Sequence, residues 1–138
     1  MTLAQLSKDL EERLWSAAQA ASGRAYARYS NFHVGAALLT SDGEIVTGCN
    51  VENMSYGLTN CAERTAIFRA VAEGKLGPTA SIRAIAVLNR DGHSCSPCGA
   101  CRQVIYEFGR DAIVIFSRIE GERKQLPVSA LLPECFEL

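Results

Sequence analysis

Two short segments carry the residues best suited to chemistry. Cys61 is followed two positions later by Glu63, and Cys98, directly after Pro97, is followed three positions later by Cys101. Side chains three positions apart lie on one face of a helix, so Cys98 and Cys101 can bind one ion together. The start of a helix carries partial positive charge and favours the thiolate that zinc requires. With Cys61 as a third ligand, these residues predict a Zn²⁺ site that keeps a fourth position for water, as catalytic zinc sites do.

Glu63 adds a partner for acid–base chemistry. On the helix that begins near Cys61, its carboxylate can reach the open side of the metal without binding it. A water activated by zinc needs a base that takes its proton and an acid that returns it, and one carboxylate can do both. We therefore expect an enzyme that uses an activated water, with Glu63 as its catalytic residue.

Three other interpretations stay open on these residues alone. Cys98 and Cys101, placed after a strand and at the start of a helix, also have the layout of a thioredoxin-like dithiol. A structural zinc closed by His93 or Cys95 would instead give a zinc-stabilised binding module without catalysis. Glu63 could also be an ordinary acidic residue at a helix N-terminus.

Hydrophobic periodicity and turn residues predict the elements that hold these side chains. Gly35, inside the first predicted strand, leaves little side chain and indicates close packing against it. Ser41-Asp42-Gly43 is typical of a hairpin turn. In chain order, the predicted elements are a helix that ends at Gly23, strands at 32–40 and 44–51, a helix at 61–73, a strand at 82–89, a helix at 98–108, a strand at 112–117, a further short strand at 124–126 and a closing helix at 128–132.

Several residues predict where the helices begin and end. Thr2-x-x-Gln5 has the form of a capping box, and Gly23 is expected in the left-handed conformation that ends a helix. Asn60 is the expected N-cap of the second helix. Ser96 and Pro97 are the expected N-cap and first residue of the third helix.

The order of these elements predicts an α/β fold. The strand–helix–strand unit at 82–117 should be parallel, and continuously apolar strands indicate a sheet covered by helices on both faces. We expect a three-layer α-β-α sandwich with a mixed five-stranded sheet.

Length and composition limit the function classes. The 138 residues predict a single domain, 1–138, and 14 basic against 15 acidic residues argue against nucleic acid as a partner. No apolar run approaches the roughly 18 residues that span a bilayer, so no membrane partner is expected. The six cysteines occur without a secretory signal pattern, which favours free thiols in the cytoplasm over disulfides.

Four segments together resemble one family. YSNFHVGAAL at 29–38, GCNVENMSYGLTNCAERTA at 48–66, SPCGACRQV at 96–104 and LLPECF at 131–136 are similar to cytidine deaminases of the small, homotetrameric, zinc-dependent class. The resemblance implies one zinc per subunit and hydrolytic deamination of cytidine and deoxycytidine to uridine and deoxyuridine, with release of ammonia, in pyrimidine salvage. Cys61, in place of the histidine of other deaminases, is typical of enzymes that act on free nucleosides.

The resemblance also implies roles for particular residues. Glu63 would protonate the pyrimidine N3 and help hydroxide attack C4, and Arg64 would donate to the zinc thiolates. The expected substrate-binding residues are Phe32 as an aromatic wall of the pocket, Asn50 and Glu52 on the ribose hydroxyls, and Tyr56 and Phe136 from neighbouring subunits, so that the active sites are shared within a homotetramer.

One rival function shares the zinc framework. It is deamination of an aminonucleoside antibiotic of the blasticidin S type.

Met54 and Cys135 depart from the residues common in the family, and both lie near the expected pocket or interface. Cys49, Cys95 and His33 are interpreted as residues without a chemical role.

Overall fold

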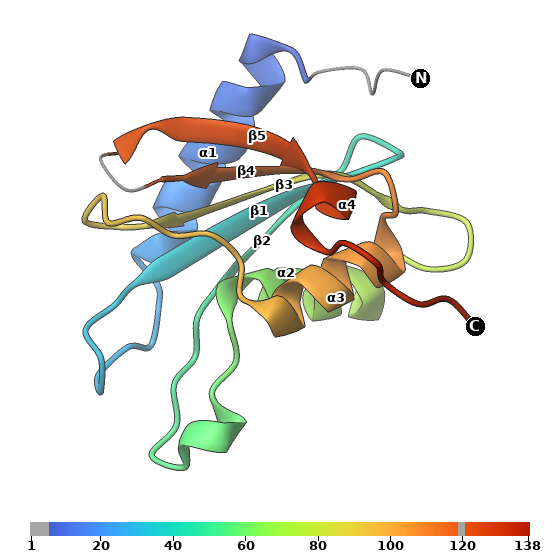
Figure 1. The fold of residues 1–138 in the computed structure, drawn as a ribbon. Coiled ribbons are helices and arrows are strands. Elements are labelled where there is room, and N and C mark those ends of the chain that lie inside the picture. The colour runs from blue at the N-terminus through green and yellow to red at the C-terminus, as the bar shows by residue number, and fades with distance from the viewer. Residues whose placement is uncertain (1–5, 119–120) are drawn as a thin grey trace.

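A mixed five-stranded sheet forms the centre of the molecule (Figure 1). The computed structural model describes residues 6–118 and 121–138. The strand order is β2-β1-β3-β4-β5, with β3 parallel to β4 and the other neighbouring pairs antiparallel. The strands are β1 (Val34–Thr40), β2 (Ile45–Cys49), β3 (Ile82–Asn89), β4 (Ile113–Ser117) and β5 (Arg123–Pro127).

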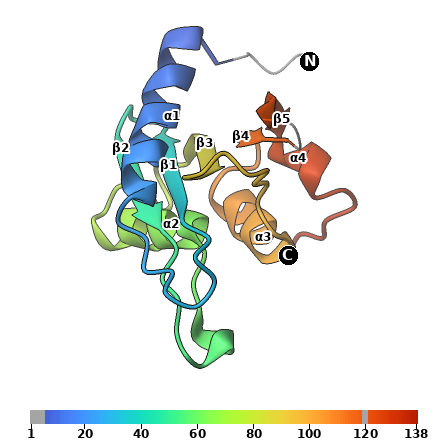
Figure 2. The same ribbon diagram turned by 90° about the vertical axis from the view of Figure 1, so that its left-hand side faces the viewer.

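Helices cover both faces of this sheet, as Figures 1 and 2 show. Helix α1 (Lys8–Ser22) packs on one face, while α2 (Ala62–Ala72), α3 (Gly99–Phe108) and the short α4 (Val128–Leu131) pack on the other. A short 3₁₀ helix, η1 (Tyr56–Leu58), lies in the connection between β2 and α2. The predicted three-layer sandwich and the parallel pairing of β3 with β4 are therefore confirmed.

Strand β1 is apolar along its length because both of its faces are buried. Ala36 and Leu38 point into the core under α2 and α3, whereas Ala37 and Leu39 point into the core under α1. Since successive side chains of a strand point to opposite faces, one apolar run serves two cores.

Two glycines let the helices approach the sheet closely. A Cβ on Gly35 would lie 2.0 Å from the carbonyl oxygen of Ala18 in α1, and a Cβ on Gly48 would lie 2.4 Å from the backbone nitrogen of Ala66 in α2. The close packing predicted at Gly35 is confirmed. Gly48 sets the depth of α2, the helix that follows Cys61.

The predicted caps of α1 differ from those in the structure. The helix begins at Lys8, and the Ser7 hydroxyl accepts the backbone N–H of Leu10 at 3.3 Å. The Thr2-x-x-Gln5 capping box lies outside the described residues. Gly23 has φ −68° and ψ −14°, so its predicted left-handed conformation is wrong. The helix ends instead in a tightened turn, where the N–H of Gly23 bonds the carbonyl of Ala20 at 3.2 Å.

The N-caps of α2 and α3 also differ from the prediction. They are Cys61 and Cys98, not Asn60 and Ser96. The carbonyl of each cysteine accepts the first backbone hydrogen bond of its helix. The donors are the N–H of Thr65, which bonds Cys61 at 3.0 Å, and the N–H of Arg102, which bonds Cys98 at 3.0 Å. The sulfur atoms accept no backbone cap bond in either helix, which leaves them available to one another.

The remaining elements lie where they were predicted, with small shifts at their ends. The strand predicted at 32–40 begins at Val34, which pairs with Asn89 of β3 and donates its N–H to the Asn50 side chain at 2.8 Å. Gly43, in the predicted hairpin turn, has φ +88°. Over the described ranges, no helix combines the length and apolar character that a membrane crossing requires.

Replacing Gly48 by alanine tests how tightly α2 packs. We expect Gly48→Ala to lower the free energy of unfolding by about 3 kcal/mol, because backbone of α2 must move away from the added methyl group. Urea denaturation measures this change. Gly57→Ala in η1 is the matched control, since its Cβ would meet no described atom within 4 Å, and it should unfold like the wild type. Equal stability of the two variants would contradict the analysis.

Candidate active site

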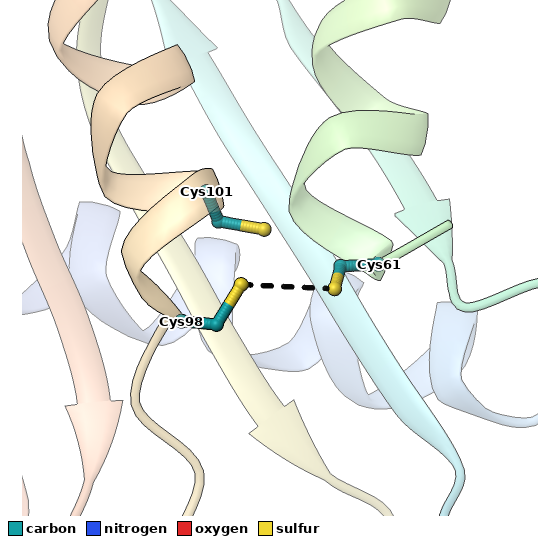
Figure 3. Close-up of side chains that lie close together, drawn as sticks. All are labelled: Cys61, Cys98 and Cys101. Atoms are coloured by element: carbon teal, nitrogen blue, oxygen red, sulfur yellow. Dashed lines mark hydrogen bonds between the residues drawn. The ribbon is translucent and has the colours of Figure 1, made fainter. Parts of the chain in front are cut away.

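Three cysteines meet where α2 and α3 begin (Figure 3). Their sulfur atoms all lie within 4.8 Å of one another, and Cys61 Sγ is 4.0 Å from Cys98 Sγ. Cys101 reaches the same point from the first turn of α3 and is fully buried. The structure thus brings together the three predicted ligands from two segments that are 37 residues apart.

This geometry fits a zinc ion. Zn–S bonds of about 2.3 Å in a tetrahedron place two sulfurs about 3.8 Å apart, close to the Cys61–Cys98 separation. Within the described ranges, the cluster contains neither His93 nor Cys95. The His93 ring instead stacks on Phe32 at 6.1 Å, and the N–H of Cys95 donates to Ser117 at 2.9 Å. Three ligands are the number found in catalytic zinc sites, so the donor set does not favour a closed structural site.

The thiols of the cluster shift one another's pKa values. The hydrogen bond between Cys101 and Cys61, helped by Arg64, lowers the pKa of Cys61, and the same bond raises the pKa of Cys101. Three thiolates with one Zn²⁺ carry a net charge of about −1, so a nearby cation stabilises the loaded site.

Arg64 supplies that cation. Its Nη2 donates to Cys61 Sγ at 3.3 Å, and this contact raises the pKa of the guanidinium, which keeps it charged. Its Nε is buried and has no acceptor among the described residues. A half-buried guanidinium whose Nε has no acceptor among the described residues is suited to an anionic metal centre beside it.

Glu63 is the buried acid of the site. It lies in the first turn of α2 and is only 4% exposed. Burial, with a smaller effect of the Cys61 thiolate, raises the pKa of Glu63 to about 7. A carboxyl group of this kind can both accept and return a proton near neutral pH.

Asn50 fixes the loop that carries Phe32. Its Oδ1 accepts the N–H of Val34 and its Nδ2 donates to the carbonyl of Phe32, both at 2.8 Å. Asn50 is buried, whereas the Phe32 ring is 37% exposed. The side chain of Asn50 therefore fixes the backbone at the start of β1 and leaves the Phe32 ring partly exposed at the surface.

Glu52 holds the same loop from a neighbouring position. Its Oε1 accepts the backbone N–H groups of Tyr29 at 2.9 Å and Ser30 at 3.1 Å, and the Ser30 hydroxyl donates to Oε2. The bond from the Ser30 hydroxyl is the largest of the contacts that lower the pKa of Glu52 and keep it ionised.

Tyr56 and Phe136 lie away from the cysteines. Tyr56, 78% exposed, lies on η1, which projects beyond the helices in Figure 1, and it makes an edge contact with Tyr29 at 6.5 Å. Phe136, 72% exposed, lies near the C-terminus and lines a pocket with Gln103 and Tyr106 of α3. Within one chain, the structure does not bring these two rings to the metal cluster.

A pocket lined by Phe32 includes two residues that the sequence analysis did not name, Ser94 and Phe116. Its volume is about 680 Å³, and Cys95 and Ser96 also line it. Ser94 lies four residues before Cys98 in the sequence, and this proximity to the metal motif is the signal that could have identified it.

Comparisons with known proteins identify the family. Residues 8–117 match the family model "Cytidine and deoxycytidylate deaminase zinc-binding region". A cytidine deaminase of Halalkalibacterium halodurans is 46% identical over 129 residues, which cover 93% of this chain and 94% of the relative. The crystal structure of cytidine deaminase from Burkholderia pseudomallei superposes with a TM-score of 0.82 at 46% identity, covering 95% of this chain and all of that one. The chain belongs to the cytidine deaminase family.

Membership of this family confirms the predicted class of enzyme, a zinc-dependent hydrolytic deaminase, and confirms zinc as the metal of the three-cysteine cluster. The dithiol-redox interpretation and that of a non-catalytic binding module are therefore wrong. A blasticidin-S deaminase of Bacillus cereus is a more distant relative, 31% identical over 105 residues that cover 73% of this chain and 74% of the relative.

Removing the Arg64 cation should weaken catalysis without unfolding the protein. We expect Arg64→Ala to lower the rate of ammonia release from cytidine about 10- to 100-fold, as loss of a partner of metal ligands commonly does. Circular dichroism checks the fold. Arg83→Ala, at an exposed arginine of β3, is the control and should match the wild type. Wild-type turnover in Arg64→Ala would disprove the role of this charge.

Proposed function

We propose that this deaminase converts cytidine and deoxycytidine to uridine and deoxyuridine with release of ammonia. The observation that carries the proposal is the buried Glu63 next to three cysteines that leave one zinc position open. Glu63 is the catalytic residue, and Cys61, Cys98 and Cys101 are the metal ligands. This reaction would serve pyrimidine salvage.

Proton transfer in this reaction runs through Glu63. Cys61, Cys98 and Cys101 would hold the zinc, which would supply an activated water for the reaction. The Glu63 carboxylate takes a proton from the attacking water and delivers it to N3 of the pyrimidine. A C–O bond forms at C4. Glu63 then takes the proton of the new C4 hydroxyl and gives it to N4, so the C4–N4 bond breaks, ammonia leaves and C4 becomes the carbonyl of the product. Burial of Glu63 excludes bulk water from these transfers.

Phe32, Asn50 and Glu52 are the proposed nucleoside-binding residues. The exposed Phe32 ring offers a face on which a pyrimidine base can stack. Asn50 and Glu52 lie on the segment that follows β2, where an amide and an ionised carboxylate can bind the hydroxyl groups of the sugar. The negative charge of Glu52 would repel a phosphate, which favours a free nucleoside over a nucleotide.

The enzyme is proposed to act as a homotetramer with shared active sites and one zinc per subunit. Tyr56 and Phe136 are large, strongly exposed aromatic residues, a type enriched at interfaces between subunits. Each would contribute to the pocket of a neighbouring subunit. The abundance of free thiols is consistent with a single-domain enzyme, 1–138, that acts in the cytoplasm.

The second candidate substrate is blasticidin S, because one relative carries that activity in its name. Ammonia release from cytidine, deoxycytidine, cytidine monophosphate and blasticidin S should be measured with the same zinc-loaded enzyme. We expect the first two to be substrates and the last two to react slowly. Faster turnover of blasticidin S would reject the proposed function.

Replacing the Glu63 carboxylate should separate metal binding from catalysis. We expect Glu63→Gln to retain zinc and to lose about 10²- to 10⁴-fold in kcat, because the amide cannot carry the proton. Zinc is measured by elemental analysis and turnover by ammonia release. A variant that holds zinc and works normally would exclude Glu63 as the acid–base residue.

Shared active sites can be tested with mixed assemblies. Subunits with Glu63→Gln and subunits with Phe136→Ala should each have low activity, whereas their co-expression should restore about a quarter of the wild-type sites by random assortment. In the control, Phe136→Ala subunits are co-expressed with subunits that carry both substitutions, and no recovery is expected. An absence of recovery in the first mixture as well would contradict a Phe136 that acts across subunits.

A further inference from the structure

The C-terminal tail, residues 133–138, is held against α3 by its penultimate residue. The Tyr106 hydroxyl donates to Glu137 Oε1 at 2.5 Å, and Arg110 Nη1 lies 3.3 Å from Glu137 Oε2. Both oxygens of one carboxylate are therefore engaged, one by Tyr106 of α3 and one by Arg110, two residues beyond the end of that helix. Contacts with Cys135 and Glu137 also raise the pKa of the Tyr106 phenol, which keeps its donor proton in place.

The end of α4, two residues before the tail, is anchored to α3 as well. Arg102 Nη1 donates to the carbonyl of Leu131 at 3.0 Å, and its Nε donates to the carbonyl of Pro97 at 2.7 Å. One guanidinium thus joins the turn before Cys98 to the end of α4. Between the two anchors, Glu134 has φ +55°, a conformation that residues other than glycine seldom adopt. The path of the tail is therefore defined at both ends and at its turn.

Phe136 lies between these anchors and still faces outward. It is 72% exposed, while its neighbours in sequence, Cys135 and Glu137, contact Tyr106. A tail without contacts to α3 would lose conformational freedom when Phe136 entered a neighbouring site. A tail that is already held has little freedom left to lose, so the ring binds at lower cost.

We propose that Tyr106, Arg110 and Glu137 are positioning residues that hold the tail so that Phe136 projects toward a second copy of this chain and completes its nucleoside pocket. This inference rests on the proposed function, since it assigns the aromatic ring to a neighbouring active site. The three residues do not contact the substrate themselves. They act through Phe136, so their loss should affect substrate binding and not the chemical step.

The test compares two variants that release the tail, Glu137→Gln and Tyr106→Phe, with the wild-type enzyme loaded with zinc. We expect each variant to raise KM for cytidine about 3- to 10-fold, with kcat within twofold of the wild type. Carboxypeptidase digestion followed by mass spectrometry should also remove the last residues faster in both. Glu134→Gln is the matched control, because it makes the same charge change in the same tail and Glu134 forms no ion pair with another described residue.

A double variant decides whether these residues act through Phe136. Glu137→Gln combined with Phe136→Ala should have the same KM as Phe136→Ala alone, since a released tail that has no ring has nothing left to misplace. An unchanged KM in both Glu137→Gln and Tyr106→Phe, or a further rise in KM when Glu137→Gln is added to Phe136→Ala, would overturn the inference. A wild-type enzyme that does not deaminate cytidine would instead reject the proposed function, and digestion of the tail would still report whether Glu137 holds it.

Discussion

The meeting of two helix starts at one point is the constraint on which the site depends. Cys61 and Cys98 are N-cap residues whose sulfur atoms accept no backbone cap bond, and Cys101 follows one turn later. The three sulfur atoms can bind one ion only if α2 and α3 begin side by side on the same face of the sheet. Gly48 has no side chain where α2 crosses β2, so this helix can lie at the required depth.

Charge compensation then determines the surroundings of the cluster. Sulfur atoms this close together cannot all ionise without positive charge nearby, and zinc, Arg64 and the two helix N-termini share that task. Glu63 occupies the same turn as Arg64 but is buried, which favours its neutral form. Adjacent residues of one helix thus have opposite electrostatic roles: Arg64 stays charged beside sulfur, whereas Glu63 can change its protonation state.

The surface next to the metal centre is built from side chain–backbone bonds. Asn50 and Glu52 follow β2 and bond to backbone groups in residues 29–34, the segment that leads into β1. The tail at the C-terminal end of α3 is organised in the same way, by Tyr106, Arg110 and Glu137. In both places, polar side chains give irregular backbone a defined position and leave an aromatic ring, Phe32 or Phe136, facing outward.

The sequence by itself determined the elements, the ligand types and the class of chemistry, because helical and strand periodicity, thiol spacing and turn residues are local properties. The strand at 82–89 was predicted without error, and the other strands and helices within about two residues, apart from the start of the first helix. The caps were less predictable, since Cys61 and Cys98 replaced the better capping residues Asn60 and Ser96. Only the tertiary structure decided that Cys61 lies 4.0 Å from Cys98, that Glu63 is buried and that Glu137 meets Tyr106. These properties arise from the packing of segments that are distant in the chain, and no local pattern of residues encodes a distance between them.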